Sequence, residues 1–256
     1  MLSAHPLLDP RRVAAALLVL LALAAALALK HHYSTASADD LRWILAPTAA
    51  LVELVTGADF VAERGAGHLS TELRYLIAPS CAGVNFLIVA FAALVLGFVR
   101  PVRSPAGNAL IVAASAAAAY AAALVANAIR IALAIQLHAG SVSWGWLTAD
   151  RMHRIAGVVV YLALLLVLFA ATRRLARARI GTWLPVCAYL GVALLVPLLR
   201  GGYARADFWE HAAIVLVVAA AGLAGAALVR RLRRISAARS GEVPRSPPSR
   251  APAGSG

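Results

Sequence analysis

Six long apolar runs constrain the fold of this chain more than any other feature of its sequence. A helix needs roughly 20 predominantly apolar residues to cross the hydrocarbon core of a bilayer, and each run approaches or exceeds that length. The runs are Val13–Leu29, Val84–Val99, Ala109–Leu137, Ile155–Thr172, Trp183–Leu199 and Ala212–Val229. Hydrophobic residues make up 62% of the chain, against roughly half in a soluble domain. The sequence therefore predicts an all-α fold, a polytopic transmembrane helical bundle with about six spanning helices.

One substantial stretch, residues 31–83, contains no predicted span. Within it, residues 41–55 are apolar but short, and Pro47 and Glu53 interrupt them. That length is typical of an interfacial or re-entrant helix. The following residues, 59–67, supply polar turn material.

The domain organisation follows from the same pattern. We expect residues 1–235 to form a single membrane-embedded domain. The remaining residues, 236–256, are rich in Arg, Ser, Pro and Gly, a composition typical of a disordered tail.

The formal net charge of +13 raises the question of nucleic-acid binding, but its distribution argues against that class of partner. Basic residues cluster on alternate connections, at Arg11, Arg12, Arg100, Arg103, Arg173, Arg174, Arg177, Arg179, Arg230, Arg231, Arg233 and Arg234. Nine of the eleven acidic residues fall on the other connections: Asp39, Asp40, Glu53, Asp59, Glu63, Glu72, Asp150, Asp207 and Glu210. This is the positive-inside pattern of a multi-pass protein, and it predicts that both termini are cytoplasmic.

Cys81 lies directly before the run that begins at Val84. The unpaired N–H groups at the start of a helix favour negative charge, which suits a reactive thiolate. Gly83 leaves room for the backbone of a substrate to approach closely. The other cysteine, Cys187, is expected to be a small buried hydrophobe.

Arg130 interrupts an otherwise apolar helix. Counted from Ala109 at the cytoplasmic side, about 21 residues at 1.5 Å each bring the chain roughly 30 Å across the membrane. Arg130 is therefore expected level with Cys81. Asn127 is three positions earlier and so lies on the same helix face. An ionisable residue within a membrane span is a functional candidate.

His153 opens the next span, at the same predicted depth, and Arg154 beside it competes for the same role. A cysteine, a histidine and an arginine at one depth form a coherent catalytic set. Cys81 would attack a peptide carbonyl and form an acyl-thioester, His153 would transfer protons, and Arg130 would stabilise the oxyanion. No cofactor is expected, and no paired Cys/His spacing suggests a metal site.

At these residues the chain resembles the exosortase/archaeosortase family. The family pattern is a cysteine followed by Ser/Ala-Gly, then Asn-x-x-Arg, then a His or Arg that opens a further helix. Here it reads Cys81-Ala82-Gly83, Asn127-Ala128-Ile129-Arg130 and His153-Arg154. The segment Ser80-Cys81-Ala82-Gly83-Val84-Asn85-Phe86, with Asn85 as a supporting residue, resembles the exosortase K branch in particular. The resemblance covers residues 41–172, the core of the expected domain.

The resemblance implies a membrane cysteine protease-transpeptidase of the bacterial inner or plasma membrane, with its active site on the extracytoplasmic side. Its expected partners are exported proteins with a C-terminal sorting signal composed of a short motif, a transmembrane helix and a basic cluster. The cleaved protein would be transferred to a lipid or cell-surface acceptor. No nucleic-acid partner is expected.

Three other functions remain open from the residues alone. A transporter would use Arg130 to bind an anion, and would show charges at mid-membrane and helices broken in matching halves, which the sequence lacks. A non-catalytic membrane scaffold would tolerate replacement of Cys81. A membrane acyltransferase would share the thioester on Cys81 but not the peptide substrate.

Overall fold

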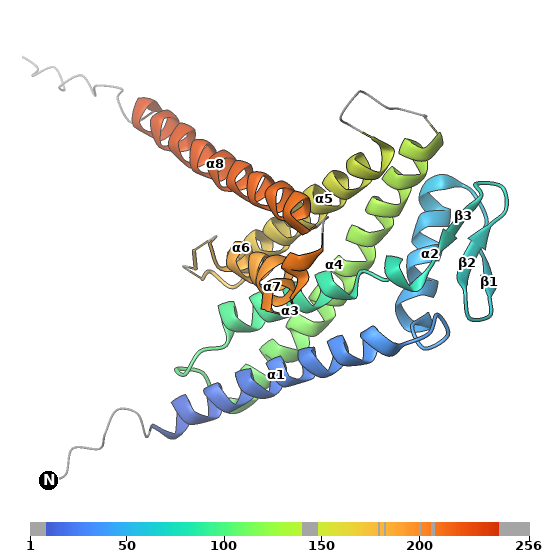
Figure 1. Cartoon of the computed structure of the whole chain (residues 1–256). Helices are drawn as coiled ribbons and strands as arrows, with labels where there is room; N and C mark the ends of the chain where they lie inside the picture. Colours follow the sequence, from blue (N-terminus) through green and yellow to red (C-terminus); the bar gives the residue numbers. More distant parts are fainter. Residues whose placement is uncertain are drawn as a thin grey trace, which may run out of the picture. The chain divides into compact units, whose positions relative to one another are not determined.

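The computed structural model describes residues 9–139, 148–178, 180–181, 183–199, 201–205 and 208–240 (Figure 1). Five helices in this part of the chain are long and apolar enough to cross a membrane. They are α1 (Pro10–Thr35), α3 (Val84–Phe98), α4 (Pro105–Ala139), α5 (Ala149–Leu175) and α8 (Phe208–Ser240). Each coincides with a predicted span, so the prediction of an all-helical, multi-pass membrane bundle is confirmed.

The sixth predicted span, Trp183–Leu199, is shorter than the other five and is not one continuous α-helix. Its parts are α6 (Trp183–Leu190), a π-helical segment η3 (Gly191–Leu195) and α7 (Val196–Leu199), followed by a 3-10 turn, η4 (Gly202–Ala204). At 1.5 Å per residue the first three elements extend over no more than about 26 Å. That is less than the roughly 30 Å of a typical hydrocarbon core.

Cys187 on α6 is exposed, so the expectation that it is buried is wrong. The buried residues of this helix are Pro185, Val186 and Tyr189. Successive residues of a helix are about 100° apart. Cys187 therefore lies on the side of α6 opposite to Pro185 and Tyr189.

The most buried span is α3, which packs against α1, α4, α5 and α6. Of its span, 67% is buried, against 28% or less in the other four. Phe86 and Leu94 are among its fully buried side chains. A helix that is apolar on all sides is suited to the interior of a bundle, and the long run beginning at Val84 provides such a helix.

The helix α4 contacts α3 at both ends of α3. Near the start of α4, Asn108 accepts a hydrogen bond from the backbone N–H of Arg100 at 3.1 Å and donates one to its carbonyl at 2.9 Å. Arg100 lies just after the end of α3, and Asn108 is only 2% exposed. The buried asparagine thus satisfies backbone groups where a helix ends, which would otherwise lack partners.

The predicted short helix at 41–55 is present as α2 (Arg42–Thr56). It packs against α4 through a buried side that includes Ile44, Leu45 and Val52. Gly57 ends the helix in the left-handed conformation, with its N–H bonded to the Glu53 carbonyl at 2.7 Å, as is common at helix C-termini.

A three-stranded antiparallel sheet follows α2 and was not predicted. Its strands are β1 (Val61–Glu63), β2 (Gly67–Ser70) and β3 (Tyr75–Ile77), in that order across the sheet. His68 of β2 pairs with Ile77 of β3. The sheet lies beside α2 (Figure 1) and β2 contacts that helix. Each strand has only three or four residues, too few to show the alternating pattern by which strands are predicted.

Contacts along the chain divide it into two units, residues 1–219 and 220–256. The first contains every element from α1 to α7, together with the start of α8. In the second, α8 continues as a single helix through Ser240. The predicted tail from 236 therefore begins within α8, and its remainder from 241 lies outside the described residues.

Candidate active site

Cys81 lies in a short connection that joins β3 to α3. Residues Pro79–Cys81 form a single 3-10 turn, η2, in which the Cys81 N–H bonds to the carbonyl of Ala78 at 2.8 Å. Proline fits the first position of such a turn because its φ is already fixed near the helical value. Gly83 then adopts φ +68° at the N-cap of α3, in the left-handed region that favours glycine. The side chain of Cys81 is half-buried and its thiol is free.

Gly83 is required for a second reason, which is close packing against α4. A Cβ added to Gly83 would lie 3.1 Å from Cγ of Asn127 and 3.3 Å from its Cβ. Both distances are shorter than ordinary van der Waals contact between carbon atoms. The glycine therefore allows the turn after Cys81 to approach the side of α4 on which Asn127 lies.

Asn127 is fully buried and connects three elements of the structure. Its Nδ2 donates a hydrogen bond to the backbone carbonyl of Cys81. Its Oδ1 accepts one from the hydroxyl of Tyr161 on α5, at 3.1 Å. Because a buried polar group needs partners, these bonds fix the Cys81 turn, α4 and α5 relative to one another.

Arg130 lies one helical turn after Asn127 on α4. Its guanidinium carbon is 5.5 Å from the centre of the Tyr161 ring, within the range of a cation–π interaction. A Cβ at Gly157 of α5 would lie 3.4 Å from Cδ of Arg130, so the arginine packs along that glycine. Its Nε is buried and has no hydrogen-bond partner among the described residues.

Three tyrosines surround Cys81 and Arg130. Tyr161 of α5 donates a hydrogen bond to Asn127 and its ring lies under Arg130, while Tyr33 of α1 donates one to the carbonyl of Pro79 in the Cys81 turn. Tyr75 of β3 forms a hydrogen bond with the side chain of Cys81.

Tyr75 has the most direct relation to the thiol. Burial raises its pKa to about 12, and the charge of Cys81 and a hydrogen bond between the two side chains act in the same direction, whereas Arg130 opposes them. The Tyr75 hydroxyl therefore stays protonated at physiological pH. It can donate a hydrogen bond to the sulfur of Cys81.

His153 and Arg154 lie near the start of α5, whose N-cap is Thr148. His153 is half-buried, one turn before Gly157, and residues four apart share a helix face. His153 is thus on the side of α5 that approaches Arg130.

Arg154 takes part in an ion-pair cluster with α8. Its Nη2 is 3.9 Å from Oε1 of Glu210, and Nε of Arg151 is 2.8 Å from the same oxygen. The structure therefore separates two residues that the sequence left as competitors. Arg154 lies with the Glu210 carboxylate, and His153 lies on the Gly157 side.

Asn85 is exposed at the start of α3 and belongs to a different set of contacts. Lys30 of α1 donates a hydrogen bond to its Oδ1 at 2.6 Å, and the same ammonium lies 5.3 Å from the ring centre of Tyr33. The Tyr33 hydroxyl in turn donates to the carbonyl of Pro79 at 3.3 Å. Asn85 therefore helps to attach α1 beside the Cys81 turn.

The structure thus joins Cys81, Gly83 and Asn127 through direct contacts, and Tyr161 links Arg130 to Asn127. The tyrosines were missed from the sequence. Tyr161 offered a signal, because it lies eight residues after His153, which is about two helical turns along the same side of α5. Tyr33 and Tyr75 offered none, since nothing in the sequence indicates that α1 and β3 reach Cys81.

Nothing among the described residues forms a group of three or more His, Cys, Asp or Glu side chains that could hold a metal ion. No protein-family model matches the chain, and no curated protein or solved structure is significantly similar to it.

Proposed function

We propose that this chain is a membrane cysteine protease-transpeptidase of the exosortase/archaeosortase type. It cleaves C-terminal sorting signals of exported proteins at the extracytoplasmic face of the bacterial cell membrane and transfers them to a surface acceptor. The observation that carries the proposal is the attachment of Cys81 to α4 by Asn127, one turn from Arg130. A thiol and a guanidinium held at one locus suit acyl transfer.

The reaction has two steps. His153 removes the thiol proton, and the Cys81 thiolate attacks the scissile peptide carbonyl, whose oxygen becomes an oxyanion beside Arg130. Collapse of this intermediate breaks the C–N bond, leaves an acyl-thioester on Cys81 and releases the amine with the proton from His153. An acceptor nucleophile, deprotonated by His153, then attacks the thioester and restores the thiol.

Arg130 is suited to the oxyanion role by its environment. Its Nε–H is buried without a partner in the described part of the chain, and a buried donor gains most from a charged acceptor. The Tyr161 ring and Gly157 hold the side chain in place. Such fixed donors stabilise a developing charge without reorganisation.

His153 is favoured over Arg154 as the proton-transfer group on two grounds. An imidazole titrates near neutral pH, whereas a guanidinium remains protonated. The contact of Arg154 with Glu210 also gives that residue a structural role in joining α5 to α8.

The helical bundle suits a substrate whose tail is itself a membrane helix. In four of the five spans 28% or less is buried, so a substrate helix can lie against them and present its scissile bond at the level of Cys81. The acceptor is a lipid or a cell-surface group, and the reaction as written requires no cofactor.

The direct test is to co-express the membrane-embedded chain with exported proteins that bear C-terminal helix-plus-basic-cluster tails. Wild type, Cys81→Ala and the matched control Cys187→Ala are compared by intact mass. We expect tail removal and a trapped thioester adduct with wild type and Cys187→Ala, and neither with Cys81→Ala. Unprocessed tails with all three proteins would move the function to a scaffold or transporter.

The proposed orientation has a separate test. A membrane-impermeant maleimide applied to intact cells should label Cys81 but not Cys187, with each single serine variant as the reference for the other cysteine. Labelling of Cys187 alone would invert the proposed topology.

A further inference from the structure

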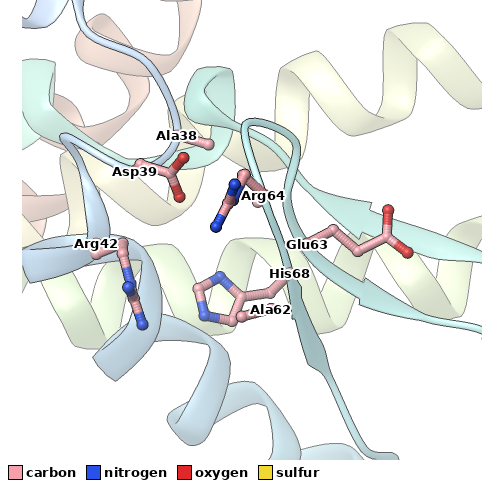
Figure 2. A pocket seen from close by; sticks show the side chains of 8 residues that line it. Ala38, Asp39, Arg42, Ala62, Glu63, Arg64 and His68 are labelled. Atoms are coloured by element: carbon pink, nitrogen blue, oxygen red, sulfur yellow. The ribbon is translucent and has the colours of Figure 1, made fainter.

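A pocket of about 430 Å³ lies between the start of α2 and the hairpin of β1 and β2. Its charged lining consists of Asp39, Arg42, Glu63, Arg64 and His68 (Figure 2). In Figure 2 the side chain of Arg42 lies to the left of the His68 imidazole and that of Arg64 lies above it, and the carboxylate of Glu63 points away from it. The pocket is not part of the Cys81 site described above.

His68 forms the buried part of this pocket. The residue is only 8% exposed, and its Nδ1 is buried without a hydrogen-bond partner among the described residues. Burial lowers the pKa of His68, and the nearby charge of Arg42 lowers it further, while Glu53 opposes the shift. A buried nitrogen that lacks a partner is destabilising, and a ligand group can supply the missing hydrogen bond.

Arg42 and Arg64 provide the positive charge of the pocket. In the described part of the chain, neither Arg42 nor Arg64 forms an ion pair with a carboxylate. The carboxylate of Asp39, which also lines the pocket, accepts a hydrogen bond from the backbone N–H of Gly65 at 3.2 Å. Guanidinium groups of this kind match the planar shape of a carboxylate.

The lining also indicates the charge of the ligand. Two arginines and two acidic residues give the pocket no net charge when His68 is neutral. The cost of removing an ion from water rises steeply with its charge, so a singly charged carboxylate enters a pocket of no net charge at lower cost than a doubly charged phosphate.

The position of the pocket connects it with Cys81. His68 pairs with Ile77, and Cys81 is four residues further along the chain. Four extended residues span at most about 14 Å. Paired strands lie about 5 Å apart, so the backbone of His68 is at most about 19 Å from Cys81, a distance that about six extended peptide residues cover.

We infer that this pocket binds an acidic side chain of the peptide that Cys81 attacks, within about six residues of the scissile bond. The inference rests on the proposed function, because only a peptide substrate links the two sites. Arg42 and Arg64 bind the carboxylate, and His68 completes its hydrogen bonding. The pocket therefore contributes to selecting the substrate.

Binding can be measured without catalysis. The full-length Cys81→Ala chain, labelled with ¹⁵N-histidine and held in lipid nanodiscs, is titrated with a polyalanine heptapeptide that carries one central glutamate. A second peptide carries glutamine instead. The His68 imidazole resonance, identified by its absence in His68→Gln, reports occupancy. Arg42→Gln/Arg64→Gln removes the arginines, and Arg74→Gln is the control, because Arg74 is an exposed arginine between β2 and β3 that does not line the pocket.

We expect a saturable shift with the glutamate peptide and at least about tenfold weaker binding of the glutamine peptide, since the glutamine side chain cannot form charge-assisted hydrogen bonds with the arginines. The double variant should abolish the shift and Arg74→Gln should retain it. Equal binding of both peptides, or a response to inorganic phosphate alone, would overturn the inference. If the glutamate peptide binds but tails remain unprocessed by the wild-type chain, the pocket assignment stands and the proposed peptidase function fails.

Discussion

The Nδ2 of Asn127 donates a hydrogen bond to the backbone carbonyl of Cys81, so a residue in the middle of one helix holds the residue that precedes another. Asn108 does the same for Arg100 at the far end of α3. Both asparagines are buried and both bond a backbone carbonyl, although Asn108 also accepts from the N–H of Arg100 where Asn127 accepts from the Tyr161 hydroxyl. Only Asn127 lies beside the candidate site.

The variants Asn127→Ala and Asn108→Ala should therefore lose similar amounts of stability but differ in activity. Asn127→Ala and Asn108→Ala each leave buried backbone groups without a partner, which costs about 1–3 kcal/mol. We expect tail processing to fall by at least about tenfold in Asn127→Ala, because the Cys81 turn loses its anchor. Processing in Asn108→Ala should remain near wild type. Denaturation in detergent and the processing assay measure the two effects, and equal losses of processing would contradict a specific role for Asn127.

Gly83→Ala should damage the site more than its backbone conformation alone explains. The control is Gly57→Ala, since Gly57 has a similar φ of +75° but, apart from its chain neighbours, no heavy atom of the described residues lies within 4 Å of the place that an added Cβ would occupy. Each variant incurs a left-handed strain of about 1 kcal/mol, but only Gly83→Ala also pushes against Asn127. We expect a greater loss of unfolding free energy in Gly83→Ala and a loss of processing in that variant alone. Identical behaviour of the two would show that the close approach to Asn127 is unimportant.

Tyr161 makes two separable contributions. Tyr161→Phe removes the hydrogen bond to Asn127 but keeps the ring that stacks on Phe86, 5.1 Å between centres, and lies under Arg130. We expect it to cost about 1 kcal/mol of stability with a modest drop in kcat. Tyr161→Leu should lower kcat further, because the cation–π contact is also lost. A phenylalanine variant as impaired as the leucine variant would assign the whole effect to the hydroxyl.

Arg130→Lys should lose most of its processing activity, by at least about tenfold, although the charge is kept. A compact ammonium reproduces neither the planar donor set nor the stacking on Tyr161. Arg154→Lys is the control, because its 3.9 Å contact with Glu210 depends mainly on charge. Near-normal turnover of Arg130→Lys would show that a positive charge is sufficient.

The stability of the chain should decrease on mild acidification because of His68. Its pKa is lowered by burial and by Arg42, while Glu53 opposes; Arg64 and Asp39 also face it across the pocket. Between this lowered value and the ordinary value near 6.5, the unfolded chain binds more protons than the folded one, so unfolding free energy falls as pH falls through that window. Above pH 7 the contribution of neutral His68 to the unfolding free energy is fully present. His68→Gln should flatten this part of the stability curve, and an unchanged slope would exclude His68 as its source.

The spanning helices and the approximate place of the site were predictable, because both depend on local patterns. A run such as Ala109–Leu137 must be helical in a bilayer, since no other conformation satisfies its backbone groups there. Counting residues along that helix also predicted Arg130 and Cys81 at one depth, and in the structure Asn127, one turn before Arg130, contacts Cys81.

The features of the fold and of the candidate site that were not predicted depend on contacts between distant segments. A single sequence does not encode such contacts in any local pattern. Tyr75 reaches Cys81 only because a short sheet brings β3 beside α3, and its strands are too short to be recognised. The preference for His153 over Arg154 as the proposed proton-transfer group likewise rests on the contact of Arg154 with Glu210, which lies more than fifty residues further along the chain. The exposed position of Cys187 followed from which side of α6 packs, and composition does not reveal that side.

The attachment of α3 to α4 at both of its ends has a mechanical consequence. Because Asn108 and Asn127 each bind backbone at one end of α3, α3 can neither slide nor rotate against α4 without breaking buried hydrogen bonds. The pair therefore moves as one rigid body that carries both Cys81 and Arg130. Any opening of the bundle that admits another helix must come from displacement of the surrounding helices, with the thiol and the guanidinium remaining in register throughout.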